Sequence, residues 1–219
     1  MAGSPINTMA ALDQYSVVKS GQYEVIRQTL YDFQTYAQAG QTQLSFFQVP
    51  VGQSSKTKAD TNMQLAGQLP FPQKFVAQSI EVVFFPGVNP GAAAAAPATV
   101  EIFVNDVWQV LKAGWLRFLV GQKDYVVEAP LGRFPAKACR LDGWSSQSDT
   151  TTAGATQLNR LSYATFGGRP YPVSPWVKLD TSINFSVELN WPTAVALNAA
   201  DTTARIGVIL DGLLIRAAQ

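Results

Sequence analysis

The chain has 219 residues and a mass of 23.7 kDa, which is sufficient for one β domain with a substantial core. Hydrophobic residues make up 47% and charged residues only 14%, a composition that excludes a disordered chain and a charged helical rod. The net charge of +1 comes from scattered basic residues, so we expect no sequence-specific binding of nucleic acid. The low charge also predicts that neighbouring subunits cover part of the surface.

The sequence contains no histidine and one cysteine, Cys139. Without histidine there is no Ser-His-Asp triad, Cys-His pair or imidazole metal site, and no glycine-rich phosphate loop occurs. We therefore expect no enzymatic activity, no cofactor and no metal. The alternative is a carboxylate glycosidase that uses two of four glutamates. These four lie in or beside expected strands, which favours solvated strand faces instead: Glu81, Glu101, Glu128 and Glu188.

No apolar stretch of the sequence reaches the roughly 20 residues that a membrane-spanning helix requires. Residues 1–10 contain no basic residue and no apolar segment, so we expect no secretory signal. A single cysteine is compatible with synthesis and assembly in a reducing cytosol. These features predict a chain without a transmembrane segment.

The first forty residues are expected to form an extended arm followed by one helix. Residues 1–20 show no stable period, whereas apolar residues recur every three or four positions within residues 22–38. Ser20 and Gly40 are suitable for the two ends of such a helix. The helix either packs on the core of its own domain or docks on a neighbouring subunit.

After Gly40 the pattern changes to short β-type runs separated by turns. Pro86 to Pro97 is expected to be a long loop, and Ser145 to Thr156 a polar loop that faces solvent or another subunit. A turn at Asn105-Asp106 is expected to interrupt the β-type run over residues 100–111. The expected strands lie within residues 43–49, 75–85, 100–111, 115–120, 125–128, 176–179, 183–189 and 205–215.

About eight strands without intervening helical patterns favour an antiparallel β-sandwich over a parallel α/β sheet. The jelly roll is the obvious eight-stranded case. We therefore predict a mainly β fold, with an arm and helix over residues 1–40 and a single jelly-roll-like domain over residues 41–219. Exposed aromatic residues on such a sandwich are also able to stack on sugars, so a carbohydrate-binding protein that uses Trp144, Tyr163 and Tyr171 is an alternative.

Several stretches resemble segments of structural proteins of environmental phages. They run from Ala59 to Met63 and from Gly67 to Pro70, from Ile80 to Gly87, and from Val208 to Gly212. Together with the arm, the expected sandwich and the absence of a catalytic set, they make residues 40–219 similar to a jelly-roll viral coat protein. A single jelly roll fits 219 residues better than the double jelly roll of tailless, membrane-containing phages.

The resemblance implies a capsid subunit that assembles in the host cytoplasm with copies of itself and other virion proteins. A virion decoration protein or a receptor-binding protein is the alternative, and peripheral contact with an internal membrane is left open. The expected inter-subunit contacts lie on the helix and the long loop: Tyr23, Ile26, Leu30 and Phe33, with Asn89, Pro90 and Ala94.

Overall fold

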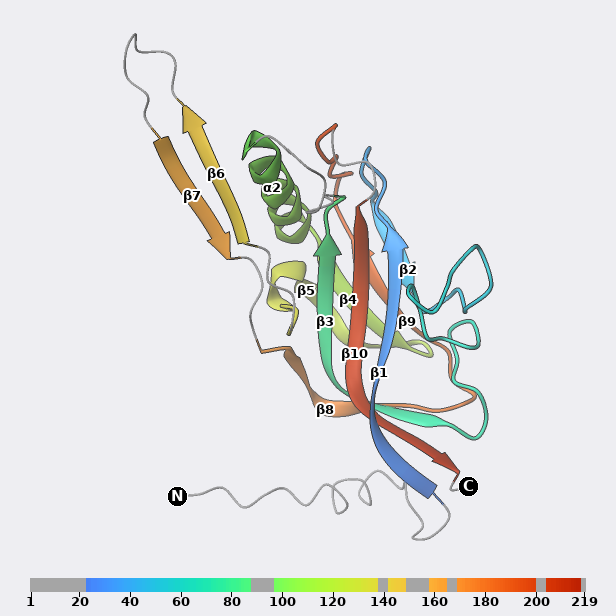
Figure 1. Ribbon diagram of the computed structural model, residues 1–219. Helices are drawn as coiled ribbons and strands as arrows, with labels where there is room; N and C mark the ends of the chain where they lie inside the picture. Colours follow the sequence, from blue (N-terminus) through green and yellow to red (C-terminus); the bar gives the residue numbers. More distant parts are fainter. Residues whose placement is uncertain are drawn as a thin grey trace, which may run out of the picture.

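Eight strands pair into two antiparallel four-stranded sheets in a computed structural model of the chain (Figure 1). The structure describes residues 23–87, 97–137, 142–148, 158–164, 169–199 and 204–217. Sheet A has the order β1 (Tyr23–Thr35), β10 (Arg205–Ala217), β3 (Lys74–Phe85) and β8 (Tyr171–Leu179). Sheet B has the order β2 (Gln43–Phe46), β9 (Phe185–Asn190), β4 (Trp115–Val120) and β5 (Lys123–Pro130).

This strand order is that of a jelly roll. The pairs β1 with β10, β2 with β9, β3 with β8 and β4 with β5 are those of one long hairpin that turns between β4 and β5. The hairpin is rolled up so that β10 also pairs with β3 and β9 also pairs with β4. The prediction of a mainly β, antiparallel jelly-roll sandwich is therefore confirmed.

The space between the two sheets is filled by alternate side chains of the strands. Along β4 and β9 buried and half-buried residues alternate, which is the period of two that places one face on the core. Phe46 and Phe118 of sheet B and Phe84 of sheet A are fully buried in this core. The interior of the jelly roll is therefore packed with apolar side chains.

Two insertions lie outside the sandwich. The helix α2 (Pro97–Ala113) connects β3 to β4, and the chain between β5 and β8 forms a short 3-10 helix, η1 (Leu131–Arg133), and a two-stranded hairpin. The hairpin consists of β6 (Asp142–Ser148) and β7 (Leu158–Ala164). Figure 1 shows it beside α2, on the side of the helix away from the sheets, and α2 contacts β6.

The predicted helix over residues 22–38 is wrong, because residues 23–35 form strand β1. This strand pairs with β10 along its whole length and is therefore part of the sandwich. Its residues are mostly β-branched or aromatic, and these types fit a half-buried pleated surface. Their apolar spacing of three and four was a coincidence of sequence that the pairing with β10 overrides.

Two other predicted elements also differ from the structure. Residues 97–113 form α2, not a strand with a turn at Asn105-Asp106, because Val107, Val110 and Leu111 lie at helical spacing and are buried together. The polar segment predicted as a loop from Ser145 begins instead within strand β6, which ends at Ser148. The remaining predicted strands coincide with β2, β3, β4, β5, β8, β9 and β10.

Candidate interaction surfaces

One end of the jelly roll carries large apolar side chains in solvent. Three connections meet there: β2 to β3, β4 to β5, and β8 to β9. Phe71 in the first connection is 87% exposed, and Leu65 in the same connection is 45% exposed. Ile183 in the last connection and Tyr125 near the start of β5 are also exposed. We call these four residues the apolar end.

Hydrogen bonds hold the three connections of the apolar end together. The backbone N–H of Phe185 donates to Gly67 O at 2.8 Å, and the N–H of Gly121 donates to Asn184 O at 2.7 Å. The amide of Gln68 also donates to the side-chain oxygen of Asn184. The exposed apolar side chains therefore project from connections that are bonded to one another.

The opposite end of the sandwich is closed by aromatic packing. Tyr36, which follows β1, lies edge-on to Phe84 and Trp191, with ring centroids 5.5 Å apart in both cases. The Trp191 Nε1–H donates to Val110 O of α2 at 2.9 Å, and the Tyr36 hydroxyl donates to Val195 O at 2.9 Å. Burial raises the pKa of the Tyr36 hydroxyl, which therefore stays protonated as a donor.

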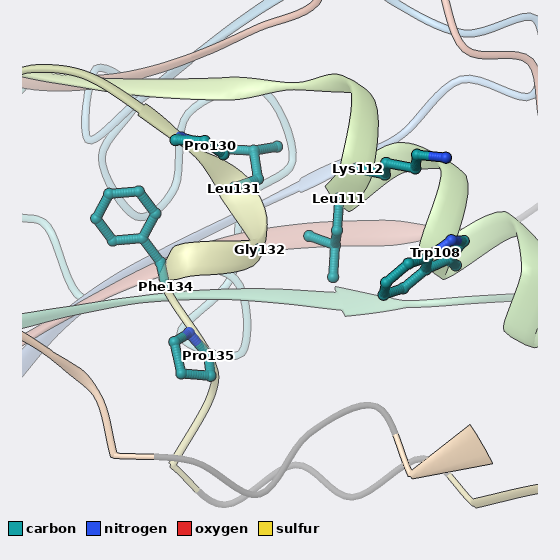
Figure 2. A pocket seen from close by; sticks show the side chains of 8 residues that line it. All are labelled: Trp108, Leu111, Lys112, Pro130, Leu131, Gly132, Phe134 and Pro135. Carbon is teal, nitrogen blue, oxygen red and sulfur yellow. The ribbon is translucent and has the colours of Figure 1, made fainter.

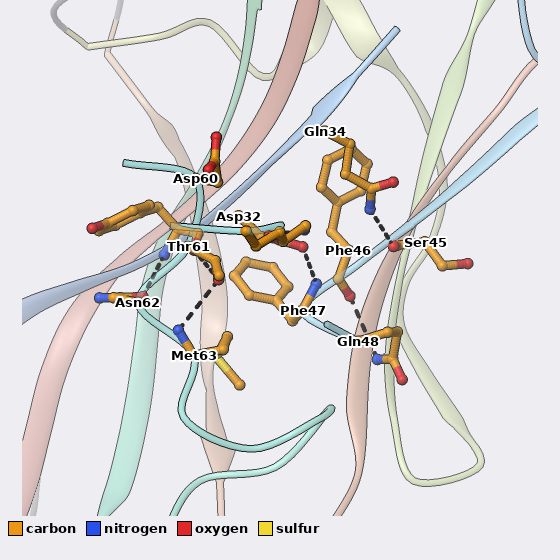
Figure 3. A network of polar contacts seen from close by, with 12 residues as sticks. Asp32, Gln34, Ser45, Phe46, Phe47, Gln48, Asp60, Thr61, Asn62 and Met63 are labelled. Carbon is orange, nitrogen blue, oxygen red and sulfur yellow. Dashed lines mark hydrogen bonds and ion pairs between the residues drawn. The ribbon is translucent and has the colours of Figure 1, made fainter. Parts of the chain in front are cut away.

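A buried carboxylate fixes the first turns of the β2–β3 connection (Figure 3). Asp32 of β1 is fully buried, accepts a hydrogen bond from the Phe47 N–H at 2.7 Å and pairs with the ammonium group of Lys56. Burial raises the pKa of Asp32, while Lys56 and the Phe47 N–H oppose that shift. This group ties the connection to sheet A.

The same connection also covers part of the free edge of β1. The Phe33 N–H donates to Asp60 O at 2.7 Å, and the Asn62 N–H donates to Tyr31 O at 3.4 Å. The Asn62 side chain accepts from the Tyr31 N–H and donates to Thr29 O. Residues 60–62 thus act as a short extra strand beside β1 from Thr29 to Phe33.

A charged depression lies on the outer face of sheet A. It is lined by Arg27, Glu81, Lys137 and Asp211, with Gln28 and Thr29. Arg27 pairs with Asp211 at 2.5 Å, and Glu81 Oε2 accepts from the Lys137 N–H at 2.8 Å. Within the described residues there is no group of three acidic or thiol side chains that would hold a metal ion.

The structure separates two of the four glutamates from which the sequence offered an acid–base pair. Glu81 alternates with core residues of β3 and lies on the outer face of sheet A. Glu188 lies on the outer face of sheet B, where it pairs with Arg117 at 3.5 Å. The side chains of Glu101 and Glu128, like Cys139, lie outside the described part of the structure. Glu81 and Glu188 therefore cannot act on one glycosidic bond.

A shallow apolar pocket lies between α2 and η1 (Figure 2). Trp108, which is 55% exposed, forms one wall, and Phe134 and Pro135 lie on the far side across Leu111. The charged group near this pocket is Lys112. The pocket, with the exposed indole of Trp108 as one wall, has the character of a small binding surface for a flat, partly apolar group.

The residues predicted to contact another subunit do not share one face. Because β1 is a strand, Ile26 and Leu30 point to one side and Tyr23 and Phe33 to the other. Leu30 is buried in the core, and Phe33 stacks on Phe85 with ring centroids 5.9 Å apart. Tyr23 is 37% exposed. Asn89, Pro90 and Ala94 lie outside the described residues. The inter-subunit role of this set stays a prediction.

The aromatic residues proposed for sugar binding also belong to different strands. Tyr171 packs edge-on against Phe134, with ring centroids 5.0 Å apart, and the Arg133 guanidinium lies over its ring. Trp144 and Tyr163 belong to β6 and β7, whose side chains are outside the described part of the structure.

The sequence reasoning missed the apolar end. A usable signal was present, because Phe71 stands between Pro70 and Pro72 in a segment that cannot form a ladder. A large apolar residue in such a segment has little chance of burial within its own sheet.

Comparison with known proteins gives no relative, since neither a protein-family model, a curated protein nor a solved structure matches the chain. Among the described residues, no helix is long and apolar enough to cross a membrane.

Proposed function

We propose that this chain is a structural subunit of a virus particle, a capsid protein that assembles with copies of itself into a phage shell. The observation that carries the proposal is the apolar end, in which Leu65, Phe71 and Ile183 are exposed on connections bonded to one another. Tyr125 is exposed beside them near the start of β5. Jelly rolls occur in viral capsids, lectins and cupins, so the fold alone does not choose among these functions.

Two further properties support a shell subunit over the other jelly-roll functions. The described space between the sheets is filled by the protein's own apolar side chains, such as Phe46, Phe118 and Phe185. The low charge of 14% means that few charged side chains oppose close contact between subunits. Both properties suit a rigid unit that works through its outer surfaces.

Burial of the apolar end in a contact between subunits would stabilise assembly. A Phe or Leu side chain that moves from water into an apolar contact contributes about 1.5–3 kcal/mol. Because Phe71 is 87% exposed, that gain is unused in the single chain and becomes available on association. Many identical copies each contribute it, and the sum favours a closed shell.

The native mass of the purified full-length chain, measured by light scattering after size-exclusion chromatography, tests the proposal. We expect particles or closed oligomers far heavier than the 23.7 kDa chain, visible as shells by electron microscopy. Phe71→Ser should reduce assembly without lowering the melting temperature. Trp108→Ser, which removes another exposed aromatic side chain, is the matched control and should assemble normally. A monomer at all concentrations and salt conditions would contradict the proposal.

The second candidate function is glycan binding by a virion decoration or receptor-binding protein. The observation that favours it is the exposed Trp108 ring beside the pocket between α2 and η1. Binding on a glycan array that Trp108→Ser abolishes and Phe71→Ser leaves unchanged would support this candidate. The same pair of variants therefore separates the two functions.

A further inference from the structure

The lower half of β1 presents an open edge of sheet A. In an antiparallel strand the N–H and C=O of one residue point to the same side, and the side alternates along the strand. The bonds from Tyr31 and Phe33 to residues 60–62 show that odd-numbered residues point away from β10. The N–H and C=O groups of Tyr23, Val25 and Arg27 therefore also point away from the sheet.

Within the described residues, no hydrogen bond reaches these groups from outside the sheet. Figure 1 shows this part of β1 below the main body of the sandwich, beside the end of β10. The coverage by residues 60–62 begins only at Thr29, whose C=O accepts from Asn62. We call residues 23–27 of β1 the open edge.

The other edge of sheet A is protected against pairing. Strand β8 contains Pro172 and Pro175, and proline removes the N–H that an added strand would need. The open edge has neither proline nor glycine, and it is rich in residues with high β-propensity. Sheet A thus blocks one edge with proline, whereas no other described residue pairs with residues 23–27 at the opposite edge, and that place is suited to accept a strand.

We propose that the open edge pairs with the open edge of a second copy of this chain, antiparallel and about a two-fold axis at Val25. In this register Tyr23 lies opposite Arg27 of the second copy, so every outward N–H and C=O of the segment finds a partner. Pairing ends before Thr29, where residues 60–62 already occupy the edge. This inference rests on the proposed function insofar as it names one contact between subunits.

Neighbouring registers are less favourable. A shift toward the N-terminal side brings Glu24 opposite Glu24 of the second copy, and like charges directly opposite destabilise a strand pair. A shift the other way brings Tyr23 opposite Thr29, whose C=O is engaged by Asn62. In the register centred on Val25, Glu24 lies opposite Ile26. The sequence of the segment therefore selects one pairing.

An apolar cluster on the outer face of sheet A continues across this contact. Val76 and Ile215 are buried there, and Val25, Leu213 and Trp176 pack against them. The cluster reaches the open edge at Val25, so the two-fold pairing places two such clusters side by side. The result is one continuous eight-stranded sheet with an uninterrupted apolar band.

Cross-linking of the full-length chain tests the register. In a Cys139→Ser background, which removes the only native cysteine, Val25→Cys should give a disulfide-linked dimer as the main product of mild oxidation. Gln28→Cys lies on the same strand, but its two copies would be far from the axis, and it should give little dimer. Failure of Val25→Cys to cross-link, or equal cross-linking of both variants, would overturn the proposal.

Proline substitution tests the hydrogen bonds. Val25→Pro removes an N–H that points away from β10, so sheet A keeps its own bonds and the variant should fold. We expect this variant to lose the contact and to show a lower native mass in light scattering, whereas Val25→Thr, which keeps the N–H, should retain the native mass of the parent. A folded Val25→Pro variant that still dimerises would overturn the proposal. Shells that form without the Val25 cross-link would reject this contact and leave the proposed function intact. Cross-linked dimers that never form larger assemblies would support the contact and contradict the proposed function.

Discussion

The carboxylate of Asp32 accepts a hydrogen bond of 2.7 Å from the backbone N–H of Phe47, fifteen residues further along the chain. Phe47 has a φ of 68°, in the left-handed region that a bulky residue rarely adopts. The bond, the buried ring of Phe47 and its contact with Phe185 together hold this conformation. Asp32 thus determines how the chain leaves β2 toward the apolar end.

Lys56→Met should destabilise the fold, and more so at neutral than at acidic pH. The substitution leaves the buried Asp32 carboxylate without its cation, which costs about 3–5 kcal/mol for a broken buried pair. Burial already raises the pKa of Asp32 in the folded state, and loss of Lys56 raises it further.

The pH dependence follows from the direction of this shift. A carboxyl group with a raised folded-state pKa favours the folded state below its unfolded value, and this contribution is lost as pH rises through the folded value. The variant should therefore recover stability relative to the parent on acidification. Urea unfolding at neutral and mildly acidic pH measures the difference, and an equal loss at both would contradict the prediction.

Gly207→Ala should destabilise the centre of sheet A. A Cβ at Gly207 would lie 2.2 Å from the Phe33 ring, which is held between Phe85 and the Arg205 guanidinium. Such overpacking typically costs about 1–3 kcal/mol. Gly132→Ala is the matched control, because a Cβ there meets no atom within 4 Å and the backbone is not left-handed. Thermal unfolding should separate the two variants, and equal melting temperatures would refute the steric explanation.

Trp191→Phe should loosen α2 while the sheets stay intact. The substitution removes the 2.9 Å bond from the indole N–H to Val110 O, and an unpaired buried carbonyl costs about 1–3 kcal/mol. We expect the substitution to speed hydrogen exchange in the last turns of α2 and to leave exchange in β9 unchanged, as measured by mass spectrometry. Unchanged exchange in α2 would show that the indole contributes through packing alone.

The strands between Gly40 and the end of β10 were largely predictable because one face of each packs on the core. Ile206, Val208 and Leu210 alternate with less buried neighbours or glycine, and proline or glycine marks the ends of several runs. The sandwich architecture was also accessible, since about eight short strands with no helical repeat leave few architectures, but the exact strand order was not.

Two of the three mispredicted elements, β1 and α2, were missed for different physical reasons. In β1 both faces are partly covered, by the core on one side and by Arg205 and Phe85 on the other, so Leu30 and Phe33 are both packed and the alternation is obscured. In α2, Val100, Ile102 and Val104 alternate as in a strand, but the segment of 17 residues is long for one. The length of the segment indicated a helix, although the alternation of apolar residues indicated a strand.

The interaction surfaces were less accessible from sequence than the fold. The apolar end combines three connections that are far apart in the chain, and only their hydrogen bonds bring Gly67, Gly121 and Asn184 together. The position of the open edge depends on which half of β1 is covered by residues 60–62, and the sequence pattern of β1 itself does not indicate this.

The pairing of β1 with β10 also determines when the protein is able to fold. Glu24 and Arg216 form an ion pair across 192 residues of sequence. During synthesis β1 therefore has no partner in its sheet until β10 has left the ribosome, and contacts of such long range close slowly. Under the proposed pairing of open edges, a growing chain is able to offer residues 23–27 as the edge of a complete sheet A only after β10 has been made.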